Sequence, residues 1–204
     1  MNIAPLGVSG QISTQPLLAS IHPDRNAEGM AVQRREVLKL GVVDLGVEKA
    51  QLPNGVTVEL AVVRHPGASA IVALDEHYRV TLLRQWRHAM GGWMWEIPAG
   101  CRRPGETALA CAARELSEET GLGARRWDHL GGIVTIPSFC DERIELYLAR
   151  ELTDAPGEMD HDEVINTTRV DLEEALAMIT RGDMVDAKSI VALLRTRDFV
   201  AGTN

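Results

Sequence analysis

The chain has 204 residues, a length that one hydrophobic core can serve, so we expect one main domain rather than two. Hydrophobic residues make up 45% of the chain and charged residues 25%, which is typical of a folded globular protein, and no apolar run approaches the roughly 18 residues of a membrane-spanning helix. Because 29 acidic residues outnumber 21 basic ones, the net charge of −8 disfavours binding to a nucleic-acid backbone.

The first part of the chain predicts an arm followed by a β-hairpin. Residues 1–35 mix Gly, Ser, Pro, Gln and Asn without sustained periodicity, so we expect a flexible arm ahead of a domain over residues 36–204. From Glu36 to Val63, apolar and polar residues alternate on both sides of the turn cluster Pro53-Asn54-Gly55. This pattern predicts a hairpin over residues 36–63.

Short strands are expected before and after one central helix. The helix begins near Thr107, has apolar residues at helical spacing, and ends at Gly121. The predicted strands are Ser69–Leu74, Arg79–Gln85, Gly132–Ile136, Arg143–Ala149 and Glu163–Val170, and a short apolar segment, Trp93–Ile97, is stopped by a loop at Pro98-Ala99-Gly100.

Two more helices are expected in the last part of the chain. Asp171-Leu172-Glu173-Glu174 resembles a capping box that opens the first of them, and Gly182 ends it. The second begins at Asp186. The order of strands, one helix, more strands and two helices predicts an α/β fold in which helices cover a mixed sheet.

Three carboxylates share one stripe of the central helix, beside its buried face. Glu118 and Glu119 lie within about 60° of Glu115 around the helix axis. Like charges at this spacing destabilise a helix, and Mg²⁺, which prefers oxygen ligands, would neutralise them. Arg114 lies one turn before Glu118 and can pair with it. The alternative interpretation is a solvated acidic face.

The residues around this helix match a longer pattern. From Gly100 the chain reads G-CRRPG-E-TALACAA-RE-L-S-EE-T-G-L, which resembles the Nudix box, G-x5-E-x7-R-E-U-x-E-E-x-G-U, where U is a bulky apolar residue. The matching residues are Gly100, Glu106, Arg114, Glu115, Leu116, Glu118, Glu119, Gly121 and Leu122. The resemblance to Nudix hydrolases implies an α/β/α sandwich with a mixed β-sheet and a loop-helix-loop catalytic motif.

The same resemblance implies the chemistry and the metal ligands. Nudix hydrolases use Mg²⁺ or Mn²⁺ to cleave a nucleoside diphosphate linked to another group. The implied ligands are the carboxylates of Glu115, Glu118 and Glu119 and the backbone carbonyl of Ala99, with Glu106 and Arg114 as supporting residues. Glu118 and Arg114 are therefore expected among the catalytic residues as well.

Flanking segments resemble one branch of the family. Gln85-Trp86-Arg87 and Trp95-Glu96-Ile97-Pro98-Ala99-Gly100 are similar to segments of ADP-ribose pyrophosphatases. Pro137, sixteen residues after Gly121, matches the proline that marks this branch, and Asp186-Ala187-Lys188-Ser189 is similar to the start of its last helix. The resemblance therefore favours ADP-ribose over nucleoside triphosphates or capped RNA.

Substrate contacts can be carried over from the same resemblance by position. Arg87 would bind the pyrophosphate, because a planar guanidinium can bind two phosphate oxygens at once. Glu96 would bind the polar part of the substrate near it, and Glu59 would lie where relatives contact the base. Arg64 and Arg84 are further candidates for the pyrophosphate, and Pro137 is also expected at the substrate.

The catalytic base is expected on the segment 158–163, where relatives carry acids on a loop. We favour Glu163, as either the base or a metal ligand. Some relatives have an E-x-E pair where this chain has His161-Asp162-Glu163, so Asp160, His161 and Asp162 are alternatives for the first acid, and Glu142 is a further candidate for the base.

The family also implies a homodimer, with the N-terminal hairpin at the interface. Several relatives stack adenine on N-terminal aromatic residues, yet no Trp, Tyr or Phe precedes Tyr78 in this chain. Trp86, Trp93 and Trp95 could provide a stacking face or could be packing residues.

The cysteines indicate the compartment. Cys101, Cys111 and Cys140 are odd in number and lack a C-x-x-C spacing, so neither a disulfide framework nor a zinc site is expected. Without a basic cluster leading into an apolar segment at the N-terminus, a reducing cytoplasm fits best.

The sequence therefore predicts a Mg²⁺-dependent Nudix pyrophosphatase that hydrolyses ADP-ribose, a nucleoside diphosphate sugar, to AMP and ribose 5-phosphate. One alternative is the same chemistry on GDP-mannose or another sugar nucleotide. Another is a sensor that binds a nucleotide sugar without cleaving it. The complete set Glu115, Glu118 and Glu119 and the lack of a basic DNA-binding extension argue against the sensor.

Overall fold

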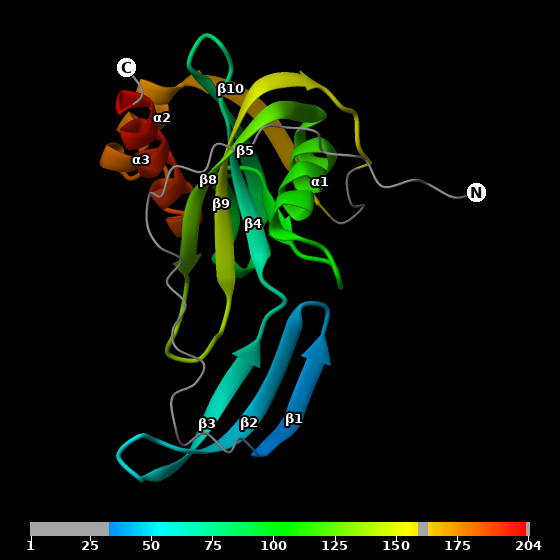
Figure 1. The fold of residues 1–204 in the computed structure, drawn as a ribbon, viewed down its shortest axis with the longest axis vertical. Helices are drawn as coiled ribbons and strands as arrows, with labels where there is room; N and C mark the ends of the chain where they lie inside the picture. The colour runs from blue at the N-terminus through cyan, green and yellow to red at the C-terminus, as the bar shows by residue number, and fades with distance from the viewer. Residues whose placement is uncertain (1–32, 159–162, 203–204) are drawn as a thin grey trace, which may run out of the picture.

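The computed structural model describes residues 33–158 and 163–202, arranged as a main α/β body with a small antiparallel sheet at one end (Figure 1). Most of the arm expected over residues 1–35 lies outside the described residues, and residues 33–35 belong to a strand. No described helix is long and apolar enough to cross a membrane.

The small sheet consists of β1 (Gln33–Leu40), β2 (Val43–Gln51) and β3 (Thr57–Arg64), with the antiparallel order β1-β2-β3. The hairpin predicted around Pro53-Asn54-Gly55 is confirmed as β2 and β3, but its first half is not one strand, because a turn at Gly41 divides it into β1 and β2. Gly41 has a φ of 56°, a conformation that glycine adopts easily, but Gly41-Val42 is a weak turn signal in a sequence.

Two further sheets form the main body. One contains β10 (Ile165–Asp171), β5 (Arg79–Arg87) and β6 (Gly92–Glu96), in that order. The other contains β7 (Ala99–Cys101), β4 (Ala68–Ala73), β9 (Arg143–Asp154) and β8 (Leu122–Val134), in that order. Because β4 and β9 are parallel whereas β7 and β8 pair antiparallel with their neighbours, the predicted mixed sheet is confirmed.

Helices cover both faces of this mixed sheet: α1 (Ala108–Thr120) lies on one face, and α2 (Leu172–Arg181) and α3 (Ala187–Ala201) lie on the other (Figure 1). Along β4, Val72 packs in the core cluster that contains Leu193 of α3, whereas Ile71 packs in the cluster that contains Leu116 of α1. The alternation follows from the two-residue period of a strand. The predicted α/β/α sandwich is confirmed.

The helix ends agree with the sequence except at one cap. Thr107 caps α1 by accepting a hydrogen bond from the Ala110 amide at 3.2 Å, and Gly121 ends the helix with a φ of 69°. Asp186 caps α3 by accepting from the Ser189 amide at 3.0 Å. The capping box predicted at Asp171 is wrong, because this side chain makes no capping hydrogen bond at the start of α2.

Several strands differ from their predicted bounds. β8 begins directly after α1 and covers 122–134, whereas only residues 132–136 were predicted, because glycines and charged residues interrupt the apolar alternation. The loop predicted at Pro98-Ala99-Gly100 contains the short strand β7, and β10 begins two residues later than predicted. A three-residue 3₁₀ helix, η1 (His88–Met90), joins β5 to β6.

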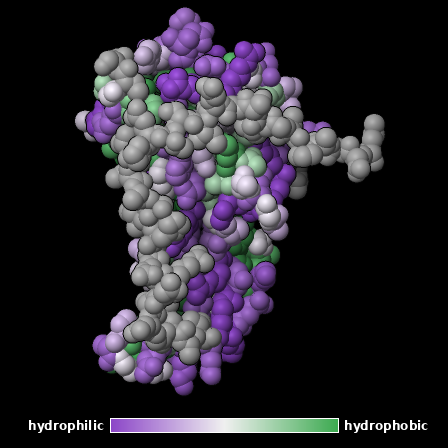
Figure 2. All heavy atoms as spheres, viewed as in Figure 1, coloured by the Kyte–Doolittle hydropathy of each residue, from purple (hydrophilic) through white to green (hydrophobic). Residues whose placement is uncertain are grey.

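Hydrophilic residues make up most of the coloured surface seen in Figure 2, and hydrophobic residues appear there in small separate areas. Among the described residues, the small sheet carries several exposed apolar side chains, including Leu38, Leu40 and Leu60, which are 49%, 73% and 44% exposed. Apolar side chains at such a density on a thin sheet indicate a surface that another molecule can cover.

Candidate active site

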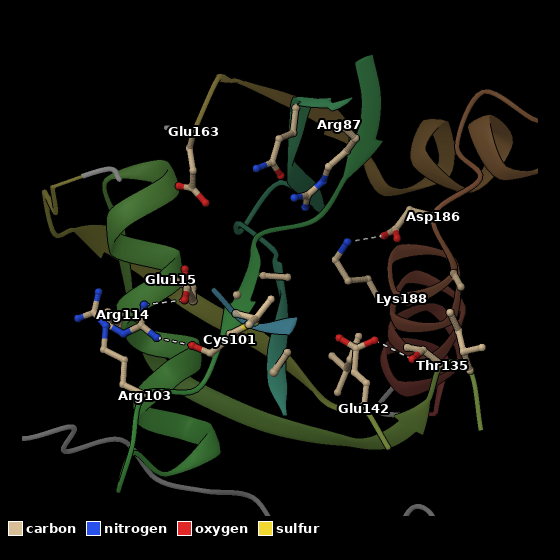
Figure 3. A pocket seen from close by; sticks show the side chains of 18 of the residues that line it. Arg87, Cys101, Arg103, Arg114, Glu115, Thr135, Glu142, Glu163, Asp186 and Lys188 are labelled. Carbon is tan, nitrogen blue, oxygen red and sulfur yellow. Dashed lines mark hydrogen bonds and ion pairs between the residues drawn. The ribbon is translucent and has the colours of Figure 1, made fainter. Parts of the chain in front are cut away.

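A cavity of about 770 Å³ lies between α1, the end of β5, β7 and the start of α3 (Figure 3). Glu115 and Glu163 lie on one side of it, with Arg103 and Arg114 near Glu115, and Arg87 and Lys188 lie on the other side, with Asp186 beside Lys188. Its volume is in the range of small-molecule sites. The Nudix-like segment and the flanking segments therefore meet at one cavity.

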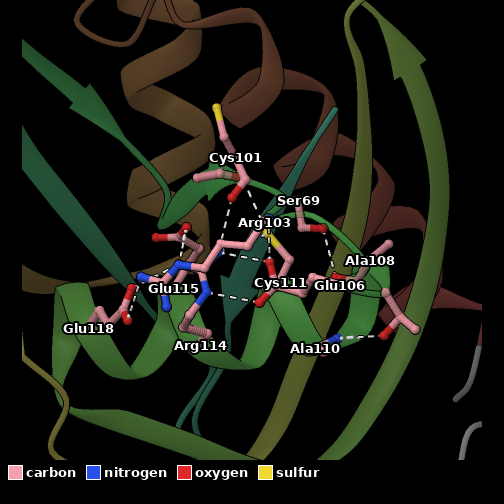
Figure 4. Close-up of polar contacts among 12 residues, drawn as sticks. Ser69, Cys101, Arg103, Glu106, Ala108, Ala110, Cys111, Arg114, Glu115 and Glu118 are labelled. Atoms are coloured by element: carbon pink, nitrogen blue, oxygen red, sulfur yellow. Dashed lines mark hydrogen bonds and ion pairs between the residues drawn. The ribbon is translucent and has the colours of Figure 1, made fainter. Parts of the chain in front are cut away.

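Arg114 ties together the carboxylates of the box (Figure 4). Its guanidinium donates to both Glu106 oxygens at 2.9 and 3.0 Å, to Glu115 Oε1 at 2.5 Å and to Glu118 Oε2 at 2.8 Å. It also donates to the carbonyl of Cys101 at 3.0 Å, which links α1 to the end of β7. The pairing of Arg114 with Glu118 was predicted from the helix spacing, and the other contacts were not.

Glu118 is held by a second arginine. Arg103 donates to its Oε1 at 3.2 Å, so both oxygens of Glu118 accept from guanidinium groups. The Arg114 hydrogen bond is the main reason that the pKa of Glu106 is lowered. These contacts place Glu106 and Arg114 where they support the orientation of Glu115 and Glu118.

Glu119 is buried and incompletely paired. Its side chain is turned inward so that Oε2 accepts from the Ala99 amide at 2.8 Å, whereas Oε1 has no hydrogen-bond partner among the described residues. Burial raises its pKa to about 9, and the charges of Glu115 and Glu163 add to this effect. Burial also raises the pKa of Glu115, although Arg114 opposes the change. A cation close to these acids would lower the cost of ionising them.

The residues fit a divalent cation in two respects. First, Oε1 of Glu119 is buried and has no hydrogen-bond partner among the described residues. Second, Gly100 has no side chain and therefore leaves a space beside the Glu115 carboxylate, which we call the Gly100 cradle. Carboxylate oxygens are the ligands that Mg²⁺ prefers. As the side chains stand, no group of three or more His, Cys, Asp or Glu residues within 33–158 and 163–202 is arranged to hold a metal, and Arg114 donates to oxygens of both Glu115 and Glu118.

Gly100→Ala tests this cradle, because a Cβ at Gly100 would come within 2.5 Å of the Glu115 carboxylate and displace it. Metal affinity is expected to fall by about tenfold to hundredfold, as measured by the Mg²⁺ dependence of turnover and by Mn²⁺ binding. Gly92→Ala is the matched control, since nothing lies within 4 Å of its Cβ position. Equal metal affinity in the two variants would contradict the cradle.

The basic side of the cavity is built on one buried carboxylate. Glu96 is 2% exposed and accepts two hydrogen bonds from Arg87, both at 2.7 Å, and one from Lys188 at 2.5 Å. Burial alone would raise the pKa of Glu96, but the two cations outweigh it and lower the pKa to about 2. Glu96 thus positions Arg87 at the cavity, and its own oxygens are already occupied.

Glu96→Gln is expected to lower the free energy of unfolding by about 2 kcal/mol at neutral pH. Because the folded-state pKa lies below the ordinary value of 4.5, the carboxylate stabilises the fold above pH 4.5, and this stabilisation is lost as the pH falls toward 2. Urea unfolding of both proteins at several pH values measures the difference. If the difference did not shrink in acid, the ion-pair explanation would be wrong.

Glu142 and Glu163, the two candidates for the base, both line the cavity. Glu142 Oε2 accepts from the Thr135 hydroxyl at 2.6 Å, and His65 Nε2 lies 3.5 Å from Oε1. Glu163 extends toward α1 and Glu115 in Figure 3, and its charge contributes to the raised pKa values of Glu115 and Glu119. Glu163 is therefore the candidate beside the acids of the box.

Other predicted residues are not at the cavity. Glu59 is exposed on β3, and Pro137 is exposed in the turn between β8 and β9. Arg64 donates to both oxygens of Glu48, at 2.8 and 2.6 Å, and to Asp141 at 3.0 Å. None of the three lines the cavity of this chain. Asp160, His161 and Asp162 lie outside the described residues.

Arg84 points away from the cavity as well, since its guanidinium lies over the rings of Trp93 and Trp95. Trp86 lines the cavity, is 42% exposed and meets Trp93 edge to face. From the sequence, Lys188 was assigned no role of its own and was named only within the helix-start segment Asp186-Ala187-Lys188-Ser189. Its position beside Glu96 could not be read from two segments 92 residues apart, although a cation in the first turn of a helix is an unusual placement that signals a specific partner.

Comparison with known proteins identifies the family. The NUDIX domain model matches residues 63–193. The ADP-ribose pyrophosphatase of Bacillus subtilis (strain 168) is 33% identical over 171 residues, which cover 83% of this chain and 92% of that protein. The ADP-ribose pyrophosphatase of Mycobacterium tuberculosis is 35% identical over 171 residues, which cover 82% of this chain and 83% of that protein.

A solved structure shows the same fold. The crystal structure of an ADP compounds hydrolase superposes with a TM-score of 0.75 and 21% sequence identity, covering 87% of this chain and 97% of that one. The family model covers more than half of the chain, and the two relatives cover most of it. The chain therefore belongs to the Nudix hydrolase family.

Proposed function

We propose that this chain is a Mg²⁺-dependent pyrophosphatase that hydrolyses ADP-ribose to AMP and ribose 5-phosphate. The observation that carries the proposal is one cavity in which the carboxylates of Glu115 and Glu163 lie across from the guanidinium of Arg87. A pyrophosphate linkage has anionic oxygens for both sides, directly to a guanidinium and through a divalent metal to carboxylates. The names of the two bacterial relatives support ADP-ribose.

The metal ligands would be the carboxylates of Glu115 and Glu119, with Glu118 and the carbonyl of Ala99 completing the set. When bound, a divalent metal supplies charge neutralisation at the phosphates and lowers the pKa of a water molecule; Mn²⁺ can supply the same chemistry. Arg114 would keep its contact with Glu106 and release Glu115 and Glu118 to the metal.

Glu163 would accept the proton of the attacking water, because it lines the cavity next to the acids of the box. The water oxygen forms a bond to one phosphorus as the bond from that phosphorus to the bridging oxygen breaks. Arg87 would bind the phosphate oxygens, fixed in place by Glu96. Glu142 would face the substrate from the Thr135 side of the cavity, as an acceptor or as an alternative base.

A substrate panel tests this assignment. The full chain is incubated with Mg²⁺ and, separately, ADP-ribose, GDP-mannose, NADH and dGTP, and the products are identified by chromatography. AMP and ribose 5-phosphate, formed fastest from ADP-ribose, are the expected result. GMP and mannose 1-phosphate as the main products would identify a GDP-mannose pyrophosphatase instead. Ligand binding without turnover of any substrate would identify a sensor.

A homodimer is part of the same proposal. The exposed apolar side chains of β1, β2 and β3, such as Leu38 and Leu40, would be covered by a second copy of the chain. A partner would also place Glu59 or Arg64 near a cavity that they do not reach within one chain. Light scattering of the full chain tests the dimer.

We place the protein in the reducing cytoplasm, because Cys101, Cys111 and Cys140 are free thiols.

A further inference from the structure

Lys188 is held at the cavity by two carboxylates. Its ammonium donates to Glu96 Oε2 at 2.5 Å and to Asp186 Oδ2 at 2.9 Å. The side chain is 12% exposed and lines the same cavity as Arg87 and Glu115. In Figure 3, Lys188 and Arg87 lie on one side of the cavity and face Glu115 and Glu163 on the other.

A purely structural role leaves two features of Lys188 unexplained. Glu96 already accepts from Arg87 with both oxygens, so it does not need a second cation for its hydrogen bonds. An ammonium also has three N–H donors, and only two of those of Lys188 have acceptors among the described residues. Burying an ammonium is costly, and the Lys188 side chain, which is 12% exposed, lines the cavity.

We propose that Lys188 is a second phosphate-binding cation, which donates to a phosphate oxygen of the substrate beside Arg87. This inference rests on the proposed function of the cavity. Arg87 offers a planar fork for two oxygens, and Lys188 offers a point charge whose position Glu96 and Asp186 fix in advance. Because the shared Glu96 carboxylate holds both cations at one wall, little side-chain entropy is lost when a diphosphate binds them.

Lys188→Met tests the proposal, because it removes the charge and keeps an unbranched side chain. The probe is the analogue of ADP-ribose with a methylene group between its phosphorus atoms, titrated calorimetrically into the full chain with Mg²⁺. We expect affinity for the analogue to fall by about tenfold to hundredfold and affinity for adenosine, which has no phosphate, to stay unchanged. Lys188→Arg should recover part of the loss, since it restores the charge.

Arg84→Gln is the matched control, because it removes a cation of β5 that lies over Trp93 and Trp95 and does not line the cavity. Unchanged analogue binding by Lys188→Met, together with a lower melting temperature, would overturn the proposal and leave Lys188 a structural partner of Glu96. The proposed function would survive that result. If the unmodified chain neither bound the analogue nor cleaved ADP-ribose, both proposals would fail.

Amine labelling gives a second test on the unmodified chain, which requires no variant to fold. The chain has only three lysines, Lys39, Lys49 and Lys188, so each labelled peptide can be assigned by mass spectrometry. The analogue should protect Lys188 from acylation and leave Lys39, whose side chain is 64% exposed on β1, fully reactive. Adenosine should not protect Lys188. Equal labelling of Lys188 with and without the analogue would overturn the proposal.

Discussion

Glu119→Gln is expected to lower kcat by about a thousandfold or more while the fold is retained. In the unmodified chain, the hydrogen bond from the Ala99 N–H is the only one that the Glu119 carboxylate accepts among the described residues. The amide of glutamine keeps an oxygen that can accept this hydrogen bond. The substitution removes the negatively charged carboxylate, which is the kind of ligand that a divalent metal prefers. The loss should therefore appear in turnover and in metal binding, and folding should be spared.

The same substitution has a stability signature. The pKa of Glu119 is about 9 in the folded chain, above its ordinary 4.5, so without metal the stability of the unmodified chain falls as the pH rises through this window. The neutral amide removes this penalty. In EDTA at pH 8, Glu119→Gln should melt at a higher temperature than the unmodified chain, and added Mg²⁺ should stabilise only the latter.

Circular dichroism melts and product release measure these two effects. Glu173→Gln is the control, because Glu173 is an exposed glutamate in the first turn of α2, away from the cavity. It should leave kcat and the Mg²⁺ response as they are in the unmodified chain. Unchanged turnover of Glu119→Gln would mean that Glu119 is not a metal ligand.

Arg114→Leu is expected to lower the free energy of unfolding by about 3 kcal/mol. Arg114 is 16% exposed and neutralises Glu106, Glu115 and Glu118 at once, so its removal leaves three acids close together. The carboxylates hold its pKa above the ordinary value, and it remains charged at any pH at which the protein folds. The substitution also removes the hydrogen bond to the Cys101 carbonyl, which links α1 to the end of β7.

Arg103→Leu provides the comparison for this substitution. Arg103 makes one hydrogen bond to Glu118 with a side chain that is 57% exposed, and exposed pairs of this kind contribute about 1 kcal/mol at most. Urea unfolding in the absence of metal should therefore separate the two variants. Mg²⁺ should recover part of the stability of Arg114→Leu, because it neutralises the same acids. A stability loss as small as that of Arg103→Leu would contradict the role of Arg114.

The box and its helix could be predicted because their determinants are local. The cap at Thr107, the end at Gly121 and the pairing of Arg114 with Glu118 all depend on residues within a few turns of one helix. The sandwich could be predicted from the order of elements, and β4 confirms it by alternating its side chains between two cores. Periodicity alone missed the turn at Gly41 and most of β8, where glycines and charged residues break the pattern.

The basic side of the cavity could not be predicted from the sequence in the same way. Glu96 and Lys188 are 92 residues apart, and they come within hydrogen-bond distance because the first turn of α3 lies at the end of β6, where the Ser189 hydroxyl also accepts from the Ile97 amide. Glu96 was expected to touch the substrate, yet Arg87 and Lys188 occupy its oxygens. Glu59 and Arg64 carry the right chemistry but lie on β3, away from the cavity of their own chain.

Metal-dependent hydrolysis at this cavity is tested by the release of AMP from ADP-ribose by the full chain, measured side by side in Mg²⁺, in EDTA and with Glu119→Gln in Mg²⁺. We expect AMP and ribose 5-phosphate in equal amounts with Mg²⁺ and almost none in the other two reactions. Equal release of AMP in Mg²⁺ and EDTA, or by the variant and the unmodified chain, would contradict metal-dependent hydrolysis at this cavity.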